Sequence, residues 1–190
     1  MSTERILVHS SIAEPFSHAL KETTTQIFGP NSPTPVLVSS IGVSKNKALL
    51  SNAISKGASV ILGDPNSSED LPTKMRPVIV GNITKDMDLY YTESFGPTVS
   101  LYTFETEEEA LALANDTDYG LAGAVFTEDL AAGLRVAKGY ETGAVHINSM
   151  SVHDESALPH GGVKKSGFGR FNGAQGLEEF VRTKTVTWKD

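Results

Sequence analysis

Cysteine is absent from all 190 residues of this sequence. Disulfide bonds and thiolate metal sites are therefore excluded within the chain, and so is a cysteine nucleophile. Long apolar runs are also absent, and the N-terminus lacks a basic region followed by an apolar stretch. The sequence therefore predicts neither a membrane-spanning segment nor a secretory signal, and we expect a cytoplasmic protein.

Acidic residues outnumber basic residues, with 23 Asp and Glu against 16 Lys and Arg, which gives a formal net charge of −7. This balance argues against nucleic acid or an anionic membrane as the main partner. A hydrophobic content of 39% and a charged content of 21% are ordinary for a folded globular protein. The length suits one good core, or one domain with a small appendage.

Apolar segments that read as strands alternate with segments that read as helices along the whole chain. Strands are predicted at residues 5–9, 58–62, 77–83, 98–104, 121–126, 144–147 and 184–188. Helices are predicted at about residues 11–27, 44–56, 128–138 and 173–183, with a further helix opening near Thr106. This alternation predicts an α/β fold with an open, mainly parallel sheet and helices on both faces.

Two predicted helices open with a possible capping box, in which a serine or threonine precedes a glutamate by three residues. One box spans Ser11 to Glu14 and the other spans Thr106 to Glu109. Acidic residues are favourable at a helix N-terminus, so the triplet at residues 107–109 is interpreted as helix capping rather than as a metal site.

Residues 159–170 are too rich in glycine for the interior of a helix or strand, so they predict an ordered loop of fixed shape. A phosphate-binding loop is the alternative. The spacing of these glycines matches neither the Walker pattern nor the dinucleotide pattern, and no capped helix follows at the required position. Close packing of the loop on the core is the preferred interpretation.

This glycine-rich run resembles the C-terminal signature of the aldehyde dehydrogenase superfamily, and three other blocks match that family in the expected order. They are residues 93–97, Asn115 with residues 119–122, and residues 143–148. The sequences of residues 147–155 and 158–162 most resemble those of the salicylaldehyde and vanillin dehydrogenase branch. The resemblance implies a catalytic-domain portion at residues 1–182 and an oligomerisation strand at residues 183–190.

Residues 1–6 look like the stretch directly after the nucleophilic cysteine of that family. The family's cofactor domain, its general-base glutamate and its oxyanion-binding asparagine belong to the portion before this point. The resemblance therefore implies that this chain does not oxidise aldehydes and uses no cofactor or metal. In the family, Glu93 and Phe95 correspond to residues that touch the nicotinamide ribose and ring, and here we expect them to be vestigial.

Ionisable residues of the inferred substrate pocket are the candidates for chemistry. His153 and Asp154 lie in the loop that lines the aldehyde entry pocket of the resembled family, and His160 is typical of the salicylaldehyde-type branch. A histidine beside a carboxylate can act in general acid–base catalysis, although neighbours in an extended loop usually point apart, which favours a role in pinning the loop. The predicted catalytic residues are Glu93, His153, Asp154 and His160. The predicted substrate contacts are Phe95, Tyr91, Asn148 and Phe168.

Three functions remain open on the sequence. The preferred one is a cofactor-free, non-redox enzyme of cyclase or isomerase type that acts on a hydrophobic metabolite, for example in natural-product biosynthesis. The others are a scaffold or regulatory subunit of an intact dehydrogenase and an inactive isolated domain. In the resembled family, one face of this portion packs on the cofactor domain, and an uncovered apolar face of this kind favours self-association. We therefore expect a homo-oligomer, formed through that face or through residues 184–188.

Overall fold

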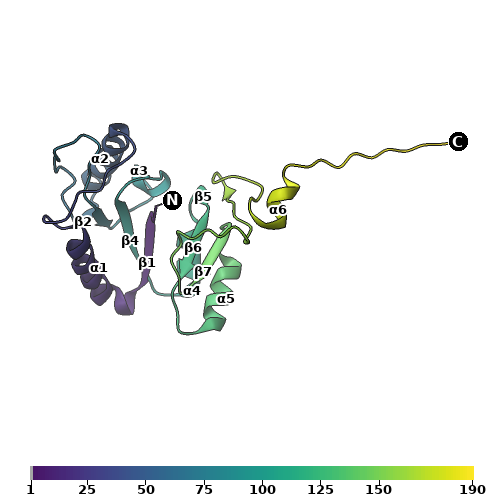
Figure 1. The fold of residues 1–190 in the computed structure, drawn as a ribbon. Helices are drawn as coiled ribbons and strands as arrows, with labels where there is room; N and C mark the ends of the chain where they lie inside the picture. Colours follow the sequence, from purple (N-terminus) through teal and green to yellow (C-terminus); the bar gives the residue numbers. More distant parts are fainter. Residues whose placement is uncertain (1) are drawn as a thin grey trace. The chain divides into compact units, whose positions relative to one another are not determined.

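The computed structural model describes residues 2–190, which divide into two compact units, Met1–Leu113 and Ala114–Asp190. Unit 1 is built on a four-stranded sheet, which Figure 1 shows beside α1 (Ala13–Phe28) and α2 (Ser40–Ser55). The strand order is β1-β4-β3-β2. Strand β1 (Arg5–His9) is parallel to β4 (Thr98–Phe104), which is parallel to β3 (Val78–Gly81). Strand β2 (Ser59–Leu62) is antiparallel at the edge, so the predicted mainly parallel α/β fold is confirmed.

Helices cover both faces of this sheet. On one face, Ile79 of β3 and Leu101 of β4 pack with Phe16 of α1. On the other face, the neighbouring Val80 and Tyr102 pack with α2 and α3 (Asp88–Tyr91). Successive side chains of a strand point to opposite faces, so the continuous apolar run of β3 supplies both layers of the core.

The predicted capping box before α1 is wrong. A short 3-10 turn, η1 (Ser10–Ile12), precedes this helix, and the N-cap residue of α1, Ile12, makes no side-chain capping hydrogen bond. The ring of His9 instead accepts a hydrogen bond from the backbone N–H of Ser11 at 3.2 Å. The same ring also contacts the carbonyl oxygen of Glu105 at 3.1 Å, and this long-range contact favours the turn.

The second capping box is confirmed at helix α4 (Glu107–Asn115). The hydroxyl of Thr106 accepts from the backbone N–H of Glu109 at 3.2 Å. The Glu109 carboxylate accepts from the backbone N–H of Glu105 at 2.8 Å, one residue earlier than in the usual box. The acidic triplet therefore serves the helix start, and residues 2–190 contain no group of three or more acidic, histidine or cysteine side chains suited to a metal ion.

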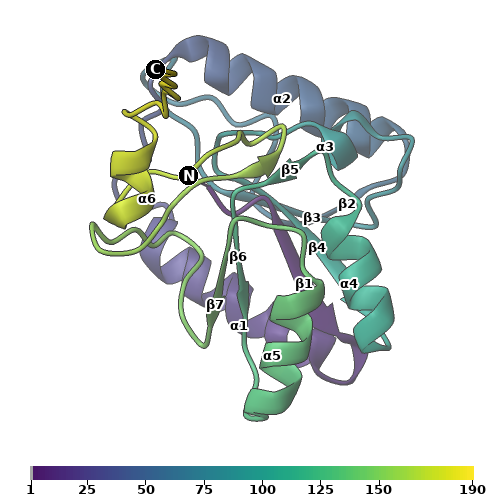
Figure 2. The ribbon, with the colours of Figure 1, turned by 90° about the vertical axis from the view of Figure 1, so that its right-hand side faces the viewer.

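Unit 2 contains a parallel pair of strands joined by a helix (Figure 2). Strand β6 (Ala122–Val125) leads through α5 (Leu130–Gly139) to β7 (Ala144–Ile147), and the side chain of Asp129 caps the helix by accepting from the N–H of Ala131 at 2.8 Å. Strand β5 (Tyr119–Gly120) pairs antiparallel with β8 (Val163–Lys164).

The C-terminal end differs from the prediction. Helix α6 (Gly173–Glu178) is shorter than the predicted helix over residues 173–183. Residues 182–190 run extended and exposed beyond it, and the predicted strand at residues 184–188 is not formed in the described chain (Figure 1). A strand needs a hydrogen-bonded neighbour, and this segment has none within its own unit, so its role in oligomerisation remains a prediction. Over residues 2–190, every helix is too short or too polar to cross a membrane.

Candidate functional site

The loop of residues 93–97 is fixed in unit 1 by a buried asparagine. The side-chain amide of Asn46 donates to the carbonyl oxygen of Ser94 at 3.0 Å, and its oxygen accepts from the hydroxyl of Thr98 at 2.7 Å. The loop packs so closely that a Cβ added to Gly96 would lie 2.3 Å from the Asn46 amide nitrogen. The glycine of this motif is therefore required by contact with Asn46.

Two predicted substrate contacts, Phe95 and Tyr91, lie in or beside this loop and are exposed, with Phe95 65% accessible. Burial raises the pKa of the Glu93 carboxyl group above its usual value, and the charge of Glu4 raises this pKa further, whereas the charge of Lys45 lowers it. Lys45 also donates to the backbone carbonyl of Glu93 at 2.8 Å. This environment favours a protonated Glu93 more than water does.

The other predicted catalytic residues lie together in unit 2, in the loop after β7. The ring Nε2 of His153 lies 2.7 Å from a carboxylate oxygen of Glu155. Asp154 points elsewhere, because its Oδ1 accepts from the side-chain amide of Asn172 at 2.7 Å and lies 4.0 Å from Nδ1 of His160. The adjacent residues His153 and Asp154 thus have different partners, and both pairs of contacts hold the loop.

A third histidine of unit 2, His146, lies beside this loop and is not among the candidates predicted from the sequence. Its ring centroid is 5.1 Å from that of His153, and its Nε2 atom is buried with no hydrogen-bonding partner among residues 2–190. Burial lowers the pKa of His146, and the nearby His153 and His160 lower it further. We refer to His146, His153 and His160 as the histidine cluster.

Asn148, predicted as a substrate contact, links the ends of two strands. Its side-chain oxygen accepts from the backbone N–H of Thr127 at 2.9 Å, and its amide donates to the Thr127 carbonyl at 2.8 Å. The residue has a positive φ of 56°, in the left-handed region that asparagine tolerates better than most residues. This geometry ties the segment after β7 to the segment after β6.

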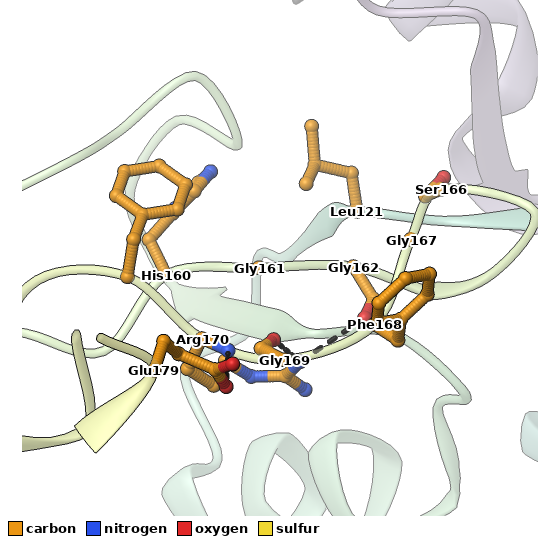
Figure 3. A pocket seen from close by; sticks show the side chains of 11 residues that line it. Leu121, His160, Gly161, Gly162, Ser166, Gly167, Phe168, Gly169, Arg170 and Glu179 are labelled. Atoms are coloured by element: carbon orange, nitrogen blue, oxygen red, sulfur yellow. Dashed lines mark hydrogen bonds between the residues drawn. The ribbon is translucent and has the colours of Figure 1, made fainter. Parts of the chain in front are cut away.

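The glycine-rich run surrounds an open hollow of about 410 Å³ in unit 2 (Figure 3). Apolar side chains of Leu121, Phe168 and Phe171 line it together with His160. The guanidinium of Arg170 donates to the carbonyl oxygens of Gly162 at 3.0 Å and of Gly169 at 2.6 Å, and so holds the loop to itself. His160 is 8% exposed and its ring lies 5.0 Å from that of Phe171.

Gly161 and Gly162 of this run serve close packing, as predicted, whereas a Cβ at Gly167 would meet nothing in the described chain within 4 Å, and that glycine is explained by its positive φ of 127°. A Cβ at Gly161 would lie 2.5 Å from the carbonyl oxygen of Gly169. A Cβ at Gly143 would lie 1.7 Å from the carbonyl oxygen of Gly161. Larger residues at either position would force the backbone of the loop apart.

The sequence and the structure of the chain have close counterparts. Residues 1–186 match the aldehyde dehydrogenase family, and the chain belongs to that family. It is 38% identical over 192 residues to a vanillin dehydrogenase of Pseudomonas fluorescens, with 98% of this chain and 39% of that protein covered. It is 36% identical over 199 residues to a salicylaldehyde dehydrogenase of Pseudomonas putida, with 98% of this chain and 39% of that protein covered.

Solved structures of other proteins also resemble this chain over part of their length. An oxidoreductase from Marinobacter aquaeolei superposes with a TM-score of 0.85 at 37% identity, covering 96% of this chain and 39% of that one. A salicylaldehyde dehydrogenase from Pseudomonas putida G7, complexed with salicylaldehyde, superposes with a TM-score of 0.84 at 34% identity, covering 93% of this chain and 37% of that one. The chain therefore corresponds to about two fifths of the length of these relatives.

Proposed function

We propose that this chain acts without a nicotinamide cofactor as a non-redox enzyme of cyclase or isomerase type, and that its substrate is a hydrophobic metabolite such as an intermediate of natural-product biosynthesis. The observation that carries the proposal is the position of His160. Its ring lines the apolar hollow, and the same loop holds the His153–Glu155 and Asp154–His160 pairs. A cytoplasmic location belongs to this proposal.

Paired imidazole and carboxylate groups support proton transfer. A carboxylate that contacts one ring nitrogen orients the imidazole and stabilises its protonated form. In an isomerisation, a proton leaves a carbon next to a carbonyl group for one base and returns from an acid to another atom of the same molecule. No electron acceptor is needed for this step. His160 and His153 are the proposed proton carriers, with Asp154 and Glu155 as their partners.

Aldehyde oxidation by these residues alone has less support. The oxidation proceeds in the family through a thiolate, and the 190 residues contain no cysteine. Glu93 and Phe95 match residues that contact only the nicotinamide end of a dinucleotide. These two residues therefore supply only a small part of the surface that such a cofactor needs for tight binding. Glu93 remains a candidate acid or base of unit 1 because burial raises its pKa.

Hydrogen–deuterium exchange tests the proposal with a panel of compounds in place of a single identified substrate. The chain is incubated in D₂O with apolar aldehydes and ketones that have an exchangeable α-proton, without nicotinamide, thiol or metal, and NMR follows exchange and new isomers. His153→Gln should slow the reaction by at least about tenfold, or about 1.4 kcal/mol of barrier, if the imidazole transfers the proton. Asp154→Asn tests the second pair.

A matched control is available in unit 1. His18 of α1 lies 3.6 Å from Glu22 in an exposed histidine–carboxylate pair that belongs to no predicted site. His18→Gln should leave the exchange rate unchanged. Equal rates in His153→Gln, Asp154→Asn and the native chain would contradict the proposal, as would the absence of catalysed exchange across the panel.

The alternative of a scaffold or regulatory subunit is favoured by the C-terminal segment. Val186 and Trp188, the apolar residues of this otherwise polar segment, are 80% and 89% exposed and are available to contact a partner. Pairing with another copy of the chain or with an intact relative through residues 184–188 would cover both side chains. An intact dehydrogenase that changes its assembly or activity on mixing with this chain would favour this second function.

A further inference from the structure

Glu4, just before β1, reaches the 93–97 loop although the two are far apart in sequence. One carboxylate oxygen accepts from the backbone N–H of Ser94 at 2.9 Å, and the other accepts from the backbone N–H of Phe95 at 3.1 Å. The hydroxyl of Ser2 donates to the same carboxylate at 2.7 Å. Three donors therefore converge on one acidic side chain.

The backbone of the loop is shaped to present these two N–H groups. Phe95 has a positive φ of 48°, which is uncommon for a residue with a large side chain. Consecutive N–H groups near a left-handed residue form a concave nest that binds anions. The loop is also held by Asn46 and Lys45, whose side chains donate hydrogen bonds to its backbone carbonyl groups. The Glu4 carboxylate accepts from its backbone N–H groups and so fills the nest.

We infer that the N–H groups of Ser94 and Phe95 form an anion-binding nest, and that Glu4 occupies this nest and acts as the positioning residue for Glu93 and Phe95. The contact fixes the left-handed turn at Phe95, and so it fixes the direction in which the exposed ring of Phe95 and the carboxyl group of Glu93 project. This inference concerns unit 1 alone and stands independently of the proton-transfer chemistry proposed for unit 2.

A negative charge in the nest also acts on Glu93. The charged groups that influence the Glu93 carboxyl are Glu4 from the segment before β1 and Lys45 from α2. Glu4 opposes ionisation of Glu93, whereas Lys45 favours it. Removal of the Glu4 charge should therefore lower the pKa of Glu93, while a role of Glu4 in packing alone would leave that pKa unchanged.

Amide NMR of the full chain tests the nest directly. In the native chain, the Ser94 and Phe95 amide hydrogens should resonate downfield and exchange slowly with solvent, since both bond to a carboxylate. Glu4→Ala should move both signals upfield and speed their exchange, and Glu4→Gln should do so partly. In both variants, carbon-detected titration should show a lower midpoint for the Glu93 carboxyl. Glu14→Gln, which removes an exposed carboxylate of unit 1, is the control and should change neither property.

Rescue by a small anion separates an anion site from a packing contact. Millimolar formate added to Glu4→Ala should restore the downfield Ser94 and Phe95 signals, whereas neutral formamide should not. If Glu4→Ala does not fold, Glu4→Gln decides by its amide shifts and its Glu93 midpoint. Unchanged amide signals in the folded variants, or signals that do not respond to formate in Glu4→Ala, would overturn the inference.

Discussion

Gly96→Ala should destabilise unit 1 more than an ordinary surface substitution. The new methyl group would lie 2.3 Å from the amide nitrogen and 2.6 Å from the amide oxygen of Asn46, well inside van der Waals contact. Asn46 is fully buried and hydrogen-bonded to Gly42, Ser94 and Thr98, so it cannot move aside without losing these bonds. Leaving a buried polar group unsatisfied costs about 1–3 kcal/mol.

Two or more of these bonds should fail together, so we expect Gly96→Ala to lower the free energy of unfolding of unit 1 by about 2–5 kcal/mol. Urea denaturation followed by circular dichroism measures the change. A double-mutant cycle with Asn46→Ala identifies its origin, because the clash disappears when the Asn46 side chain is removed. The cost of Gly96→Ala should then fall sharply in the Asn46→Ala background. The same cost in both backgrounds, or a cost below about 0.5 kcal/mol, would refute the reasoning.

The bounds of the central strands could be predicted because short apolar runs mark them, and the parallel sheet could be predicted because strand and helix segments alternate along the chain. Strands β4 and β7 have the predicted bounds. Each follows a residue that interrupts regular secondary structure, which is Pro97 before β4 and Gly143 before β7. The start of α1 could not be predicted in this way. There the ring of His9 contacts Glu105, which belongs to a distant part of the chain, and the local serine does not cap the helix.

In the candidate site, too, local segments could be predicted and long-range contacts could not. The loop after β7 carries His153 and Asp154 in one short segment, so the sequence could point to it, although the partner of Asp154, Asn172, comes from α6's N-cap position. The 93–97 loop is held by Asn46 and by Glu4, which are distant from it in sequence. No periodicity or motif spacing indicates such contacts, and only the folded chain brings the three segments together.

Three further predictions concern binding, assembly and pH. Calorimetric titration of this chain with NAD should show no dissociation constant tighter than about millimolar, and a micromolar value would contradict a vestigial site. Deletion of residues 183–190 should reduce the assembly size measured by light scattering, and an unchanged size would exclude this segment as the contact. The third prediction uses the histidine cluster. Burial lowers the pKa of His146 below its usual value of 6.5, so the unfolded chain binds a proton there more readily than the folded chain. Its neutral form therefore supports stability fully above pH 6.5, and this support is lost as the pH falls below that value. His146→Phe, which cannot be protonated, should lose less stability than the native chain between about pH 7 and pH 5 in urea unfolding. The control is His18→Phe, which replaces an exposed histidine of unit 1 and should give the pH profile of the native chain. Parallel pH profiles for His146→Phe and the native chain would show that His146 is not the group that titrates.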